Sequence, residues 1–121
     1  MSEAREFSRY KVIDLMELTG ALEGVKVPLR LATFGHGGCG FYAPEKTPFL
    51  SPPKRVFCTF SLNQTEAIKV QGNLKYVQEL SAQGKPIYFY GVEFIVPHRP
   101  MVEPIVYGLE RLKSEGKIEA A

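Results

Sequence analysis

Four closely spaced glycines constrain this chain more than any other feature. Gly35, Gly37, Gly38 and Gly40 fall within six residues, directly after an apolar-rich run that ends at Phe34. Glycine tolerates positive φ angles and lets other groups approach the backbone closely. A strand-like pattern resumes after the glycines. We therefore expect the stretch 26–42 to be either a demanding turn between two strands or a loop that binds a ligand.

Most of the chain alternates apolar and polar residues, as half-buried β-strands do. The segments expected to be strands are 25–34, 39–43, 55–62, 67–77 and 87–96. The residues from 10 to 18 fit either a strand or one face of a helix. Turns are expected around 19–24, at 63–65 and at 78–86, and the proline-rich stretch 44–53 indicates a surface loop.

The apolar period changes after Pro97. Ile105, Leu109 and Leu112 recur at helical spacing, and Gly116 is suited to the end of a helix. Five or six strands followed by one amphipathic helix predict a small antiparallel barrel or sandwich that the helix covers. We expect residues 1–9 to form a flexible arm and residues 10–121 to form a single domain.

Composition narrows the range of functions. The chain has 121 residues and a net charge of +2, which is too small for a general DNA-binding protein. It lacks the roughly 18 consecutive apolar residues that a membrane span needs, and the polar N-terminus lacks an apolar signal region. The two cysteines are expected to be reduced. These features predict a cytoplasmic protein that neither spans a membrane nor binds DNA.

The glycine-rich stretch fits the letters of a dinucleotide fingerprint but not its context. Gly35 to Gly40 reads GHGGCG, which matches GxGxxG, and a strand is expected before it. The fingerprint also needs a helix directly afterwards, because the pyrophosphate sits on that helix N-terminus. The sequence instead continues as FYAP, and further prolines follow. A nicotinamide or flavin dinucleotide is therefore not expected.

Residues for metal binding or catalysis are sparse. His36 and Cys39 have plausible metal-ligand spacing, but Cys58 and His98 are isolated. The carboxylates are scattered, so no acid–base pair is indicated. We assign neither catalytic nor metal-binding residues and expect a protein that is not an enzyme. The alternative, a small enzyme with a cysteine nucleophile, predicts a thiol with a depressed pKa.

Two arginines offer a different kind of site. Arg5 and Arg9 lie on the expected arm, and guanidinium groups form paired hydrogen bonds with phosphate and with the edge of guanine. Successive glycine amides form a concavity that suits an anion. An arm folded over the glycine loop would hold a guanine nucleotide. The alternative is that both arginines are solvated charges and that the glycines only form a tight hairpin.

The order of these features resembles a PilZ domain, over nearly the whole chain. Arg5-Glu-Phe-Ser-Arg9 matches the RxxxR arm of that family, and the segment from Thr33 to Gly38 stands in the place of its [D/N]xSxxG loop. The segments 68–72 and 90–94 also resemble the family. The resemblance implies a six-stranded antiparallel β-barrel with a C-terminal α-helix. It also implies a bacterial receptor that binds cyclic di-GMP and relays the signal to a protein partner.

The second motif is degenerate. Thr33 replaces the Asp or Asn of the family, Gly35 replaces its Ser, and Gly38 matches. Losing one or two hydrogen bonds, at about 0.5–1.5 kcal/mol each, weakens binding roughly ten- to a hundredfold. The resemblance thus implies a nucleotide site whose residues are Arg5, Arg9, Thr33, Gly35, Gly37 and Gly38, with Thr33 supplying a hydroxyl. The alternative is a PilZ module that no longer binds nucleotide and acts through protein partners in pilus or motility control. The spare apolar positions of the helix leave room for a homodimer.

Overall fold

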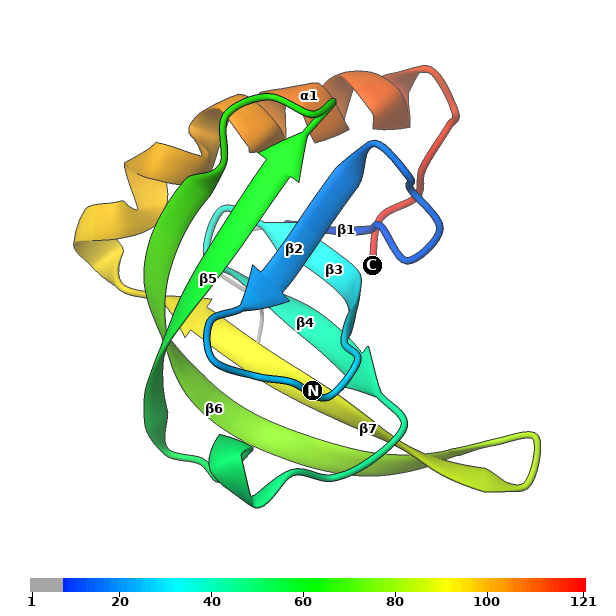
Figure 1. The fold of residues 1–121 in the computed structure, drawn as a ribbon. Coiled ribbons are helices and arrows are strands. Elements are labelled where there is room, and N and C mark those ends of the chain that lie inside the picture. The colour runs from blue at the N-terminus through cyan, green and yellow to red at the C-terminus, as the bar shows by residue number, and fades with distance from the viewer. Residues whose placement is uncertain (1–7) are drawn as a thin grey trace, which may run out of the picture.

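The computed structural model describes residues 8–121, which fold into one curled antiparallel sheet and a C-terminal helix (Figure 1). The sheet order is β1-β3-β4-β7-β6-β5-β2. In chain order the strands are β1 (Arg9–Lys11), β2 (Leu18–Leu22), β3 (Arg30–Gly35), β4 (Gly38–Ala43), β5 (Lys54–Leu62), β6 (Ile68–Ala82) and β7 (Lys85–Phe94). Short 3-10 helices, η1 (Pro48–Leu50) and η2 (Val96–Val102), precede β5 and the helix α1 (Glu103–Ser114).

The antiparallel sheet with a C-terminal helix confirms the expected fold class, but the sheet has seven strands rather than six. The unexpected strand is β2, in a segment expected to be a turn. It pairs with β5 from Leu18 opposite Leu62 to Leu22 opposite Cys58. Gly20, which reads as a turn signal, instead makes room for the Phe60 ring, 2.9 Å from where a Cβ would stand. The prediction of a turn was wrong here because Gly20 leaves space for an aromatic ring instead of bending the chain.

Two other strand boundaries differ from expectation. The strand expected over 25–34 begins only at Arg30, because the preceding residues form a loop. The strands β6 and β7 instead run through the expected turn at 78–86 and meet at Gln83 and Gly84, which have φ angles of 53° and 78°. Their projecting hairpin carries mostly exposed polar side chains, so its pairing leaves little trace in hydrophobic alternation (Figure 1).

Three phenyl rings form the centre of the core inside the curled sheet. Phe34 lies 4.8 Å from Phe60 and 5.8 Å from Phe94, between ring centroids, and all three side chains are buried. Ile105 and Leu109 of α1 are buried against the same core. The apolar spacing in the sequence therefore predicted the covering face of the helix correctly.

The helix α1 lies across one end of the sheet (Figure 1). It ends just before Gly116, whose φ of 77° is the left-handed geometry expected after a helix. Within residues 8–121, none of the helices is both long enough and apolar enough to cross a bilayer.

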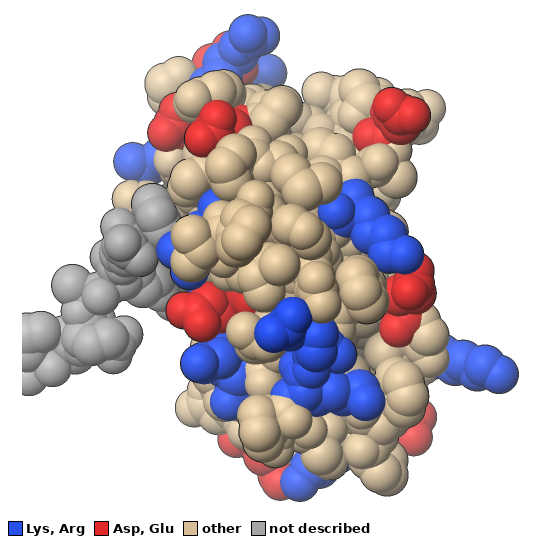
Figure 2. Space-filling view, turned by 90° about the vertical axis from the view of Figure 1, so that its left-hand side faces the viewer, with Lys and Arg blue, Asp and Glu red and all other residues tan. Residues whose placement is uncertain are grey.

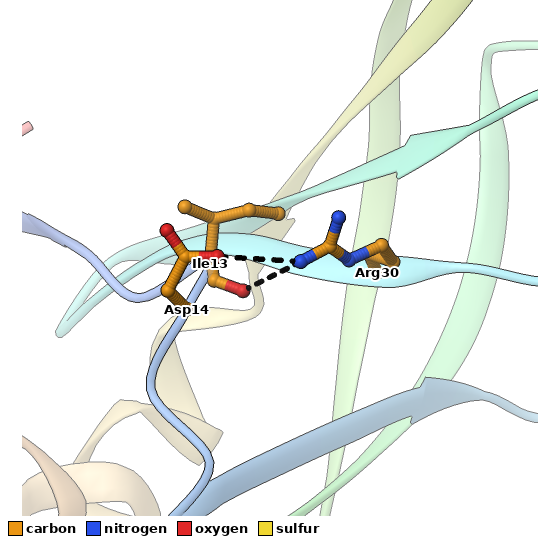
Figure 3. Close-up of polar contacts among 3 residues, drawn as sticks. All are labelled: Ile13, Asp14 and Arg30. Atoms are coloured by element: carbon orange, nitrogen blue, oxygen red, sulfur yellow. Dashed lines mark hydrogen bonds and ion pairs between the residues drawn. The ribbon is translucent and has the colours of Figure 1, made fainter.

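The chain between β1 and β2 is fixed to the start of β3. The residues from 10 to 18 form neither one helix nor one strand, because β1 ends at Lys11 and turns follow. The Arg30 guanidinium donates a hydrogen bond to the carbonyl of Ile13 at 3.2 Å and lies 3.5 Å from the Asp14 carboxylate (Figure 3). The contact holds this connection beside β3.

The other edge of β1 is covered by the C-terminal residues. The Lys11 amide donates to the Glu119 carbonyl, and the Ala121 amide donates to the Arg9 carbonyl, both at 2.8 Å. The strand that carries Arg9 is therefore paired on both sides. The expected boundary between arm and domain falls at the first residue of this strand.

Candidate functional site

The glycine-rich stretch forms a tight hairpin between β3 and β4, and β1 lies alongside it. His36 and Gly37 make the two-residue turn. In the register of β1 and β3, Arg9 lies opposite Gly35 and Lys11 lies opposite Thr33. The structure thus brings Arg9 together with the hairpin, as expected. Arg5 lies outside the described residues.

The Arg9 side chain runs over two glycines of the hairpin. A Cβ placed on Gly35 would be 2.9 Å from Arg9 Cγ, and one placed on Gly38 would be 2.6 Å from Arg9 Nη2. The same Cβ atoms would also collide with the backbone carbonyls of Ser8 and Val92. We call this arrangement, Arg9 lying over Gly35 and Gly38, the arginine track.

Close approach, rather than unusual backbone geometry, explains these glycines. Among residues 8–121, the glycines with positive φ are Gly24, Gly84 and Gly116, none of which belongs to the hairpin. The expectation that the glycine-rich stretch supplies positive φ angles was therefore wrong. Any larger residue in the arginine track would push Arg9 away or separate the strands.

The hydroxyl of Thr33 is covered. Its Oγ1 is buried and has no hydrogen-bond partner among the described residues. A Cβ on the neighbouring Gly40 would lie 2.9 Å from this hydroxyl and 2.8 Å from a ring carbon of Phe89. Thr33 therefore lies in the hairpin, with its hydroxyl buried on the side of β4 where the Phe89 ring also packs.

Phe89 belongs to a second feature of the outer face. Its ring lies over Gly40, and the Tyr76 ring lies over Gly91, which pairs with Gly40 across β4 and β7. The two rings stack with centroids 6.2 Å apart, and Tyr42 packs edge-on against Phe89 at 5.1 Å. We call these rings, Tyr42, Tyr76 and Phe89, the aromatic patch.

The turn residues are held by the rest of the fold. The Gly37 carbonyl accepts a hydrogen bond from the Phe94 amide at 2.9 Å. His36 Nε2 lies 3.4 Å from Glu103 Oε2 at the start of α1. A groove of about 290 Å³ runs between the turn and α1, and Glu103 and Glu110 line it. The negative charges of these two carboxylates repel a phosphate group. The side of the hairpin that carries Arg9 is therefore the better place for an anion.

A row of polar residues extends from the arginine track across the sheet, and sequence reasoning missed it. Gly38 pairs with Glu93, Glu93 with Asn73, and Asn73 with Arg55. Arg55 Nε donates to Asn73 Oδ1 at 2.8 Å. These residues are far apart in the sequence, and only the register of four strands aligns them. Figure 2 shows Lys and Arg side chains gathered on the lower half of the face at the left of Figure 1.

The cysteines are placed as core residues. Cys39 and Cys58 are free thiols with no exposed surface. Burial, together with a hydrogen bond to the Cys58 thiol, raises the pKa of Cys39 well above its ordinary value. This shift is opposite to the one that a cysteine nucleophile needs.

The histidine and cysteine positions considered for a metal do not converge. His98 Nδ1 accepts a hydrogen bond from the Gln71 amide at 2.9 Å, which gives the imidazole a structural role. In the described part of the chain, no three His, Cys, Asp or Glu residues lie close enough together to hold a metal ion.

Comparison with known proteins identifies the fold. No family model matches the sequence, and no curated protein matches it. Among solved structures, the chain resembles the PilZ domain with cyclic di-GMP of YcgR from Escherichia coli, with a TM-score of 0.69. The two are 16% identical in sequence, and the match covers 94% of this chain and 97% of that one. The chain therefore has the fold of a PilZ domain.

Proposed function

We propose that this protein is a bacterial, cytoplasmic receptor that binds cyclic di-GMP and relays the signal to a protein partner. The observation that carries the proposal is the arginine track. It holds a guanidinium group over Gly35 and Gly38 in the β3–β4 hairpin. By the sequence resemblance, this hairpin would take the place of the family's nucleotide-binding loop. In this role the protein is a binding module rather than an enzyme.

The chemistry of the arginine track suits a cyclic dinucleotide. The Arg9 guanidinium is able to form paired hydrogen bonds with phosphate or with the O6/N7 edge of guanine. Gly38 matches the family motif and lies directly under this guanidinium. The solved structure with the similar fold is described as containing cyclic di-GMP. Arg5 would supply the second guanidinium of the RxxxR arm.

The relay depends on the arm. Binding would order the arm against the hairpin, and a partner protein would recognise the new surface. A switch of this kind works when the ligand prefers the ordered state. The pairing of β1 with both β3 and the C-terminal residues gives the arm a fixed starting point.

Isothermal titration with cyclic di-GMP tests the proposal. We expect the wild type to bind and Arg9→Ala to bind roughly tenfold or more weakly, because a charged hydrogen-bond donor is lost. Arg111→Ala is a matched control, because it removes the same charge from the exposed face of α1. The absence of binding up to high micromolar ligand, or an unchanged affinity in Arg9→Ala, would refute the proposal.

A second function is favoured by the state of the hairpin. Gly35 offers no side chain, and the Thr33 hydroxyl is buried. These two residues support a PilZ module that has lost its nucleotide and acts only through protein partners. A pull-down from cell extract distinguishes the two functions. The degenerate module would capture the same partners with and without cyclic di-GMP, whereas a receptor would change its partners when the nucleotide is added.

A further inference from the structure

The polar row beside the arginine track brings several cations around one carboxylate. Glu93 Oε1 lies 3.6 Å from Lys75 Nζ, and Glu93 Oε2 lies 3.8 Å from Arg99 Nη2. Arg55 is held in the same row through its hydrogen bond to Asn73. Arg9 joins from the other side, because its Nη2 and the Glu93 Cα lie 2.6 Å and 3.3 Å from the same point above Gly38.

The Glu93 contacts are loose. Strong ion pairs between nitrogen and carboxylate oxygen have separations of about 2.7–2.9 Å, and both of these contacts are longer. The Glu93 side chain is 48% exposed and that of Lys75 is 56% exposed, so solvent and ions reach them. The Arg99 side chain is only 14% exposed and is therefore well fixed. A loosely held carboxylate among positioned cations is one that another anion can displace.

We propose that Lys75 and Arg99 form a second anion subsite next to Arg9, and that the Glu93 carboxylate occupies it as an internal competitor. The subsite suits a ligand that carries two phosphate groups, with one phosphate at Arg9 and the other in place of the Glu93 carboxylate. Glu93 thereby limits the affinity of the site. The identity of the ligand as cyclic di-GMP rests on the proposed function, whereas the subsite itself rests on the row of charges.

The alternative role for Glu93 is purely structural. In that case Lys75, Arg99 and Glu93 form a surface ion-pair network, and such pairs contribute little to stability. Removing the carboxylate would then leave anion binding unchanged. The two roles differ in the direction of one measurement, which is the affinity of a variant without the Glu93 charge.

The experiment compares four proteins by isothermal titration at low salt. They are the wild type, Glu93→Gln, Glu93→Gln combined with Lys75→Met, and the control Glu79→Gln. Glu79 lies on the projecting β6–β7 hairpin and is exposed, so its variant changes the net charge by the same amount without altering the row. Two probes are used separately, inorganic pyrophosphate in magnesium-free buffer and cyclic di-GMP. Urea unfolding of each protein verifies that it is folded.

We expect Glu93→Gln to bind pyrophosphate roughly three- to tenfold more tightly than the wild type, because exposed charge pairs have modest energies. The added Lys75→Met change should reverse most of that gain, and Glu79→Gln should match the wild type. Equal or weaker binding of both probes by folded Glu93→Gln would overturn the subsite, as would an equal gain in Glu79→Gln.

The two probes separate this inference from the proposed function. Tighter pyrophosphate binding in Glu93→Gln, with no binding of cyclic di-GMP by any variant, would support the subsite and refute the nucleotide receptor. Binding of cyclic di-GMP that depends on Arg9 but is unchanged in Glu93→Gln, with no gain for pyrophosphate, would support the receptor and overturn the subsite.

Discussion

Two parts of the outer face use bare glycines in contrasting ways. In the arginine track, the side chain over the glycines is the long chain of Arg9, which ends in a charge. In the aromatic patch, the glycines are covered by rings that contact one another. Both arrangements need strands without side chains at the point of contact. The two parts differ in the side chains that lie over the glycines, which are an arginine in one and aromatic rings in the other. They therefore differ in how easily a ligand could displace those side chains.

The comparison indicates which part suits a ligand. Ring contacts in the aromatic patch stabilise one another, so a ligand would have to break them to reach the backbone. The guanidinium group in the track has the chemistry for charge-assisted hydrogen bonds with an anion. The buried hydroxyl of Thr33 lies near Gly40, the glycine under the Phe89 ring of the aromatic patch.

The largest expected effect is on the backbone of the arginine track. In Gly38→Ala the new methyl group meets the carbonyl oxygen of Val92, which cannot move without disturbing the pairing of β4 with β7. We expect the free energy of unfolding to fall by about 2–3 kcal/mol, as for other overpacked sites. Urea denaturation measures this change. A loss below about 0.5 kcal/mol would show that the track tolerates a side chain.

The next largest effect is a pH dependence of stability that arises on the inner face of the sheet, beneath the arginine track and the aromatic patch. Cys39 lies in β4 between Gly38 and Gly40, and burial raises the pKa of its thiol above the ordinary value of 9.0. The unfolded chain therefore loses this proton first as the pH rises. The contribution of the protonated Cys39 thiol to the free energy of unfolding is therefore fully present below pH 9. Above pH 9 it declines, by up to about 1.4 kcal/mol per pH unit.

Urea unfolding at several pH values between 8 and 10.5 measures this decline. The variant Cys39→Ala should show a shallower decline over the same range. The remaining slope would come from other groups such as Tyr10, whose pKa is raised by burial and by Glu110. If the free energy of unfolding of the variant declined equally steeply with pH, the Cys39 thiol would be accessible to solvent. That result would contradict its burial beneath the arginine track and the aromatic patch.

The smallest expected effect is in the aromatic patch. In Gly91→Ala the atoms nearest to the new methyl group are outer ring atoms of Tyr76, a side chain that is 44% exposed and can swing outward. We expect a loss of about 1 kcal/mol or less. The same denaturation measurement applies. A loss as large as that of Gly38→Ala would show that the Tyr76 ring yields no more easily than the backbone carbonyl of Val92.

Local sequence patterns were sufficient for much of the fold. The spacing of Ile105, Leu109 and Leu112 predicted the buried face of α1, and alternation predicted most of β4, β5, β6 and β7. The short strand β2 was missed because Gly20 resembles a turn residue, although it serves to admit the Phe60 ring. The outer half of the β6–β7 hairpin was missed because paired strands exposed on both faces have no apolar period.

The candidate site was less predictable than the fold. Sequence order was enough to bring Arg9 and the glycine hairpin together as a hypothesis, because both belong to a recognisable pattern. The row through Glu93, Asn73 and Arg55 depends on the register of strands far apart in the chain. The burial of the Thr33 hydroxyl depends on how the side chains around it pack in three dimensions. Neither the register of distant strands nor the burial of one atom leaves a signal in a single sequence.

The central claim is that the arginine track is the place where this protein binds a cyclic dinucleotide. The most direct test is a titration with cyclic di-GMP followed by the backbone amide signals of isotope-labelled protein in nuclear magnetic resonance spectra. We predict that the largest shifts occur at Gly35, Gly37 and Gly38, that Gly84 at the far hairpin tip is unaffected, and that Arg9→Ala clearly reduces the shifts at a ligand concentration below saturation. Unchanged spectra, or shifts confined to residues away from the β3–β4 hairpin, would contradict the account.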